Sequence, residues 1–194
     1  MEMERERVRR SSSSATKARI AGVFYVLSFL SAILIETFLH GKMLRVAGLA
    51  PELCFAVATV ILYRIFVPVS WSWSLLAALS NLAGLVFEAL EVHPHGVNVA
   101  LVLHGVYCLL IALLVSRSNF LPRALALLMA IAGLAWLVSI SPQLARDLHS
   151  HSQPAGFAGE GVFMLWLLAK GVDAARWREA GGFSDTESKL RAES

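Results

Sequence analysis

The chain has 194 residues, of which 57% are hydrophobic and 16% charged, with a mean hydropathy of +0.64 and a formal net charge of +3. A typical soluble domain is about 45–50% apolar and about 25% charged. The composition therefore excludes an ordinary soluble domain and indicates a membrane protein, with room for about six spans of about 20 residues and short loops.

The N-terminal segment, residues 1–18, is charged and then serine-rich, without apolar periodicity. This pattern predicts a disordered cytoplasmic tail. The apolar run that follows, 20–39, is longer than the h-region of a typical signal peptide, so we expect an uncleaved first span.

Five further apolar runs follow the first, and short polar or turn-forming segments separate them. They predict spans at residues 47–67, 74–92, 97–115, 122–140 and 157–172. The last run is short for a full crossing, so we expect it to continue as a helix through Trp177. The membrane domain is then residues 19–177, and 178–194 is a polar cytoplasmic tail.

Backbone groups cannot be solvated by lipid, so these runs predict an all-α fold, a polytopic bundle of six transmembrane helices. Orientation follows from the Lys and Arg residues near the span ends, which favour the cytoplasmic side. One side holds the basic tail with Arg64, Arg117, Arg123, Lys170, Arg176 and Arg178, and the other holds Lys42, Arg45 and Arg146. We therefore expect both termini in the cytoplasm.

Small residues at helical spacing predict where the helices approach each other closely. They are Ala77, Asn81 and Gly84 in the third span and Ala126, Ala130 and Gly133 in the fifth. The two cysteines, Cys54 and Cys108, both lie inside apolar runs, which argues against a disulfide framework or a cysteine-based zinc site.

Four ionisable residues border or enter the spans near the predicted outer face: Glu36, Glu88, His104 and Glu160. Such groups are costly in lipid, so they should face one another or a water-filled cavity. We predict an outward-opening polar pocket lined by these four, with Glu36 and His104 in contact directly or through one water. The alternative is structural: His104 as a packing and hydrogen-bonding group, and the glutamates as solvated span ends, with Glu160 favoured by a helix N-terminus.

Two pairs of histidines lie in predicted outer loops, namely His93 with His95 and His149 with His151. Imidazole is a ligand for zinc, copper and nickel, so these four residues are the candidate metal ligands. The spacing is a weak signal, because no cysteine or carboxylate stands beside them at a helical ligand spacing.

Signatures of catalysis are absent from the sequence, which has no glycine-rich phosphate loop, HExxH or GxSxG. The sequence therefore indicates no cofactor and does not favour an enzyme. The basic tails lack interleaved aromatic residues, which argues against nucleic acid as a partner.

Four segments in order resemble a known family: Arg19-Ile-Ala-Gly-Val-Phe-Tyr25, Leu62-Tyr-Arg-Ile-Phe-Val-Pro68, the hairpin with Leu103-His-Gly and Ser116-Arg-Ser-Asn-Phe-Leu-Pro-Arg123, and the stretch from Gly159 to Val172. Together, over about Arg19 to Val172, they resemble the bacterial multi-pass membrane family catalogued as domain of unknown function 4386. The resemblance implies a bacterial inner-membrane helical protein. It also implies a histidine at the position of His104, an acidic residue at that of Glu160, and a loop after the first span that is shorter here than in relatives.

The sequence thus predicts an integral membrane protein, in contact with the lipid bilayer, that binds a small molecule or ion in an outward-facing polar pocket. Two other functions stay open. One is an accessory or structural protein acting through helix–helix contacts, and the other is a membrane enzyme with a histidine-bound metal. A cavity between spans one, three, four and six would favour binding. The sequence does not indicate the oligomeric state.

Overall fold

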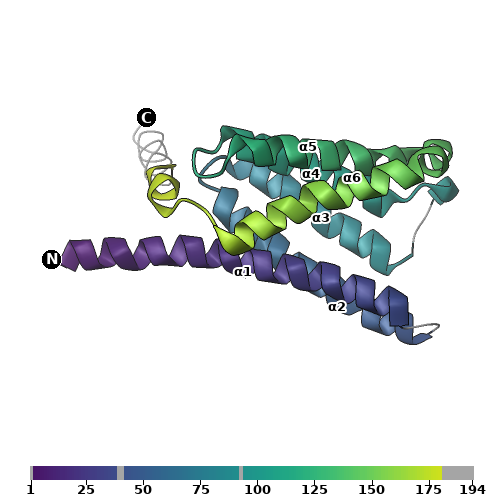
Figure 1. Cartoon of the computed structure of the whole chain (residues 1–194), viewed down its shortest axis with the longest axis horizontal. Coiled ribbons are helices and arrows are strands. Elements are labelled where there is room, and N and C mark those ends of the chain that lie inside the picture. Colours follow the sequence, from purple (N-terminus) through teal and green to yellow (C-terminus); the bar gives the residue numbers. More distant parts are fainter. Residues whose placement is uncertain (1, 39–41, 92–93, 181–194) are drawn as a thin grey trace.

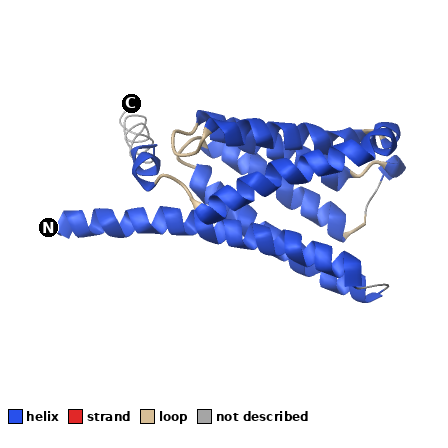
Figure 2. Ribbon diagram, viewed as in Figure 1, coloured by secondary structure: helices blue, strands red, loops and turns tan. Residues whose placement is uncertain are grey.

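A computed structural model describes residues 2–38, 42–91 and 94–180 of the chain. These residues form helices joined by short turns, with no strand among them (Figure 2). The long helices are α1 (Glu2–Phe38), α2 (Lys42–Phe66), α3 (Trp71–Ala89), α4 (Val99–Arg117), α5 (Arg123–Leu137) and α6 (Pro142–Ala169). Two 3₁₀ turns, Pro94–Gly96 and Val138–Ile140, precede α4 and α6, and a short helix, Ala174–Ala180, follows α6. The all-α prediction is confirmed.

The described helices include five that are long and apolar enough to cross a membrane. They are Ala15–Ile35, Ala47–Phe66, Trp71–Ala89, Val99–Arg117 and Arg123–Ile140. A sixth candidate is the pair Ser150–Ala169 and Ala174–Ala180, which is bent by 102°. Large apolar side chains point outward from these helices, among them Leu79, Leu127 and Leu134, each more than half exposed. Such a surface suits lipid rather than water.

The six long helices pack as a closed ring. Each helix contacts the next along the chain, and α6 also contacts α1. In Figure 1, α1 and α2 run side by side below α3, α4 and α5, and α6 crosses from α5 down to α1. The ring places one face of every helix toward a common interior.

Glycines allow the helices of this ring to approach to backbone contact. A Cβ on Gly22 would come within 2.6 Å of the Leu168 backbone, which is the contact of α1 with α6. Gly105 and Gly133 face each other between α4 and α5, where a Cβ on either would lie 2.9 Å from the other's carbonyl oxygen. On α3, Gly84 lies against Ala100 of α4. The close approaches predicted at Gly84 and Gly133 are therefore confirmed.

Residues 2–18 form the first part of α1, where the sequence predicts a disordered tail. The physical reason in residues 2–10 is helix propensity, because seven of these nine residues are Glu or Arg, which are good helix formers. Helical structure there needs no apolar face, and it continues directly into the first span.

The α6 helix begins at Pro142, fifteen residues before the predicted start of the sixth span at Phe157. Ser141 caps it by accepting a hydrogen bond from the Leu144 backbone N–H, and a proline is compatible with the first helical turn. The second proline, Pro154, removes only one backbone donor and is contained within the helix.

The sixth span does not continue as one helix through Trp177, so that prediction is wrong. Gly171 adopts a φ of +70°, a left-handed conformation that ends α6, and Asp173 then caps Ala174–Ala180 by accepting from the backbone N–H groups of Ala175 and Arg176. The Trp177 indole donates to the Ile65 carbonyl at 2.8 Å, which fastens the short helix to the end of α2.

Replacing Gly159 with alanine should destabilise the bundle by about 1–3 kcal/mol. The new Cβ would come within 2.5 Å of the Leu128 carbonyl oxygen, so α5 and α6 would have to separate. Gly161→Ala is the matched control on the same helix, because its Cβ would meet only Met164 at 3.8 Å. Reversible unfolding in detergent measures both variants, and equal stability of the two would contradict the predicted contact.

Candidate functional site

Glu160 lies in the middle of α6 with none of its surface exposed. Its carboxylate meets three hydrogen-bonding groups from three other helices. The Tyr25 hydroxyl of α1 donates to Oε2 at 2.5 Å, and the Trp136 indole N–H of α5 donates to Oε1 at 2.5 Å. The His104 Nε2 of α4 lies 2.9 Å from Oε1. These groups take the place of water around a carboxyl group that would otherwise be costly to bury.

The second nitrogen of His104 extends this network to α3 and α2. Nδ1 lies 3.1 Å from Oδ1 of Asn81, which in turn donates through Nδ2 to the Thr59 hydroxyl at 2.6 Å. Thr59 donates to the Phe55 carbonyl one turn earlier on α2. The network therefore runs through one side chain from each long helix: Tyr25, Thr59, Asn81, His104, Trp136 and Glu160.

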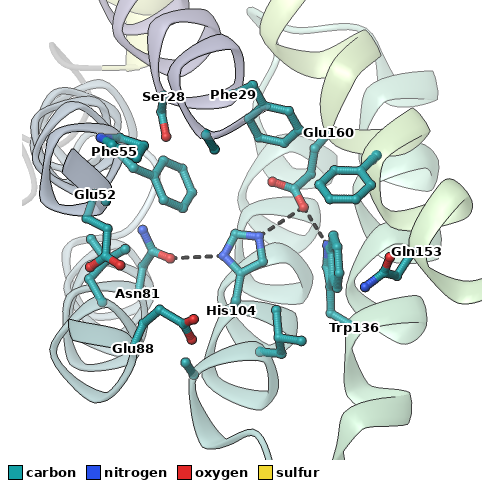
Figure 3. Close-up of a pocket in the computed structure, with 18 of the residues that line it drawn as sticks. Ser28, Phe29, Glu52, Phe55, Asn81, Glu88, His104, Trp136, Gln153 and Glu160 are labelled. Atoms are coloured by element: carbon teal, nitrogen blue, oxygen red, sulfur yellow. Dashed lines mark hydrogen bonds and ion pairs between the residues drawn. The ribbon is translucent and has the colours of Figure 1, made fainter. Parts of the chain in front are cut away.

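The close helix contacts place these side chains within reach of one another. Tyr25 follows Gly22 by one turn, His104 precedes Gly105, and Trp136 follows Gly133 by one turn. On α6 the Trp136 ring lies against Gly156, where a Cβ would come within 2.6 Å of it. Figure 3 shows His104 between Asn81 and Glu160, with the Trp136 indole turned toward the same carboxylate.

Hydrogen-bond donors determine where protons lie in the network. Thr59 has one hydroxyl proton and gives it to Phe55, so it must accept from the Asn81 amide. The Asn81 oxygen then faces His104, and Nδ1 must carry a proton. A bare ring nitrogen and a bare carboxylate oxygen would repel at 2.9 Å, so one proton lies between His104 Nε2 and Glu160 Oε1. With either atom holding it, the pair has no net charge.

A pocket of about 440 Å³ ends at this network. Its lining comes from all six long helices, with an apolar wall that includes Phe29, Phe55 and Phe157. Asn81, His104, Trp136 and Glu160 form its polar floor, and Glu52 and Glu88 contribute two further carboxylates. Figure 3 shows Glu52 and Glu88 on one side of the pocket and Trp136 and Gln153 on the other.

Three of the four residues predicted to line a common pocket line this one: Glu88, His104 and Glu160. Glu36 lies on α1, but its side chain is outside the described part of the structure, so its predicted contact with His104 stays a prediction. Glu160 does not open a helix, as the sequence suggested, because α6 begins eighteen residues earlier at Pro142. Burial and three partners, rather than a helix N-terminus, define its surroundings.

Sequence reasoning missed Tyr25, Thr59, Trp136 and Glu52 as site residues. Tyr, Thr and Trp are ordinary in membrane helices, so only their hydrogen bonds distinguish these from other residues of their type. Glu52 had a detectable signal, because it is an acidic residue five positions inside the predicted second span. Intramembrane acidic residues generally face the interior of a bundle.

The candidate metal ligands have no described common site. His93 is outside the described residues, as are the side chains of His95 and His149. His149 and His151 lie on α6 instead of in a loop, and residues two apart on a helix do not face each other. The His151 ring lies 3.0 Å from the Ser150 hydroxyl. The four-histidine metal site stays a prediction.

A different set of potential metal ligands occurs inside the network. One ligand atom each from His104, Cys108 and Glu160 lies within 4.8 Å of the other two. However, both Glu160 oxygens already accept hydrogen bonds from Tyr25 and Trp136. A metal ion would have to compete with these donors, so the arrangement is better described as a hydrogen-bonded network.

Residues 80–171 match the model of a protein family described as "Domain of unknown function (DUF4386)". This match confirms the family resemblance. The matched segment contains Asn81, His104, Trp136 and Glu160, whereas Tyr25 and Thr59 precede it. The resemblance expected from the sequence began at about Arg19, whereas the family model matches only from residue 80. No curated protein and no solved structure matches the chain.

Replacing Glu160 with alanine should destabilise the protein by about 3–5 kcal/mol, as removal of one partner from a buried pair generally does. The Tyr25 hydroxyl and Trp136 indole would lose their acceptor, and His104 its partner. Glu160→Gln keeps one acceptor oxygen and should cost less than half as much. Denaturant unfolding in detergent measures both variants, and an alanine variant as stable as the unmodified chain would contradict the network.

Proposed function

We propose that this integral membrane protein binds a small molecule in the 440 Å³ pocket above the Glu160 network. The volume supports the proposal, because ligand sites are typically concave, mostly apolar and about 300–1,000 Å³, with a few placed polar groups. The lining includes residues of α1, α3, α4 and α6, the four spans between which a cavity would favour binding over a purely structural role.

We also propose that the pocket opens to the outside of a bacterial inner membrane, with both termini in the cytoplasm. The lining residues lie in the second half of α1 and α3 and the first half of α2 and α4. They therefore gather at the end where few Lys and Arg residues occur. The opposite end holds Arg64, Arg117 and Arg123, which favour the cytoplasmic side.

A cysteine in the pocket tests both statements. Ala32 is half-buried and lines the pocket, so Ala32→Cys should react with a membrane-impermeant maleimide added outside intact cells. At least one class in a small-molecule library should slow this reaction by filling the pocket. The native cysteines are Cys54, which is half-buried, and Cys108, which is buried. Maleimide labelling of the unmodified chain therefore gives the background.

Two exposed positions serve as matched controls for this experiment. Ser150→Cys, near the same end but outside the pocket lining, should react from outside without protection by any compound. Ser116→Cys, at the other end of α4, should react only after permeabilisation. If no compound protects Ala32→Cys, so that it behaves like the Ser150→Cys control, the result would contradict ligand binding and favour a role through helix–helix contacts. External labelling at Ser116→Cys would reverse the orientation.

A further inference from the structure

Apart from His104, the ionisable groups among the described lining residues of the pocket are carboxyl groups. Among its described lining residues are three carboxyl groups, Glu52, Glu88 and Glu160, and no Lys or Arg. His104 is the basic group, and it shares its proton with Glu160, so this pair contributes no net charge. The remaining charge of the described lining comes from Glu52 and Glu88.

Glu52 is half-buried on α2, and Glu88, whose side chain is exposed, projects from α3 on the same side of the pocket (Figure 3). For the half-buried Glu52, a charge among apolar groups is costly, and the cost falls when a cation lies beside it. An anionic ligand would instead add a charge of the same sign. The two carboxylates therefore select against anions and favour a positive group at this side of the pocket.

Aromatic rings form much of the remaining wall. Phe29 and Phe157 meet edge to face with ring centroids 5.5 Å apart, and Phe157 meets Trp136 in the same way at 5.1 Å. Phe55 packs across the Tyr25 ring on the α2 side. Aromatic faces attract cations, and they also bury apolar groups. Such walls suit an alkylated ammonium group better than a hydrated metal ion.

We propose that the ligand is an organic cation, an amine or quaternary ammonium with an apolar or aromatic body. This inference rests on the proposed function. The positive group lies beside Glu52 and Glu88, and the body lies against Phe29, Phe55 and Phe157. The neutral His104–Glu160 pair forms the floor, where it offers polar contact without a charge for the ligand to compensate.

Three probes with one phenylbutyl body test this assignment: the trimethylammonium salt, its neutral isostere with carbon in place of nitrogen, and the corresponding carboxylate. The measurement is the concentration that halves maleimide labelling of Ala32→Cys in the full chain, reconstituted in lipid nanodiscs. The cation should protect at a concentration at least about tenfold lower than the neutral isostere, and the carboxylate should protect least. Empty nanodiscs correct for partition of the probes into lipid.

The variant E52Q/E88Q, made in the same background, removes both charges while keeping side-chain size. It should abolish the tenfold advantage of the cation and leave the neutral isostere unchanged. The matched control is E91Q/D147N, which removes two exposed charges near the same end of the bundle that do not line the pocket. This control should retain the advantage.

The outcomes separate the two proposals. Protection by the neutral isostere or the carboxylate as strong as that by the cation would overturn the cation assignment and leave the binding pocket intact. The cation assignment would also be overturned if E52Q/E88Q kept the tenfold advantage of the cation, or if E91Q/D147N lost it to the same extent. In either case the charge that attracts the cation would not be that of Glu52 and Glu88. Failure of all three probes would overturn the assignment, whereas the library screen decides separately whether the pocket binds any ligand.

Discussion

The structure depends on how one buried carboxyl group is solvated. Glu160 has no exposed surface and lies within a bundle whose outer face is apolar, so only protein groups can satisfy it. Tyr25, His104 and Trp136 do so from three helices, and His104 passes the connection to Asn81 and Thr59 on two more. A hydrophobic effect between helices is weak in lipid, so such a network specifies how the six helices fit together.

The network in turn depends on close helix packing. Gly22, Gly105 and Gly133 bring helix backbones into contact next to Tyr25, His104 and Trp136, and Gly156 leaves space for the indole ring. Four residues of the network, Asn81, His104, Trp136 and Glu160, form the floor of the pocket, so stability and the proposed binding site share these polar groups. The pocket walls are apolar and aromatic, and Glu52 and Glu88 are the carboxyl groups among its described lining residues that lie outside the network.

The sequence predicted the helical class, and its spans at 47–67 and 122–140 lie within a residue of the observed Ala47–Phe66 and Arg123–Ile140, because long apolar runs leave few alternatives. It also predicted one cavity lined by Glu36, Glu88, His104 and Glu160, because intramembrane ionisable groups generally face one another, and the last three residues line the pocket. It failed at the start of α6, where two histidines and Pro154 resemble a loop but lie in a helix. Tyr25 and Trp136 could not be selected, because their roles arise only from contacts 135 and 24 residues away in the chain.

A double-mutant cycle between Tyr25 and Glu160 tests the central claim most directly. The free energy of unfolding is measured for Tyr25→Phe, Glu160→Ala, the double variant and the unmodified chain. The hydrogen bond between these residues predicts that the two changes are non-additive by about 1 kcal/mol or more, because each single change already removes the contact. Additivity within about 0.3–0.5 kcal/mol would contradict it, since uncoupled residues generally give that result.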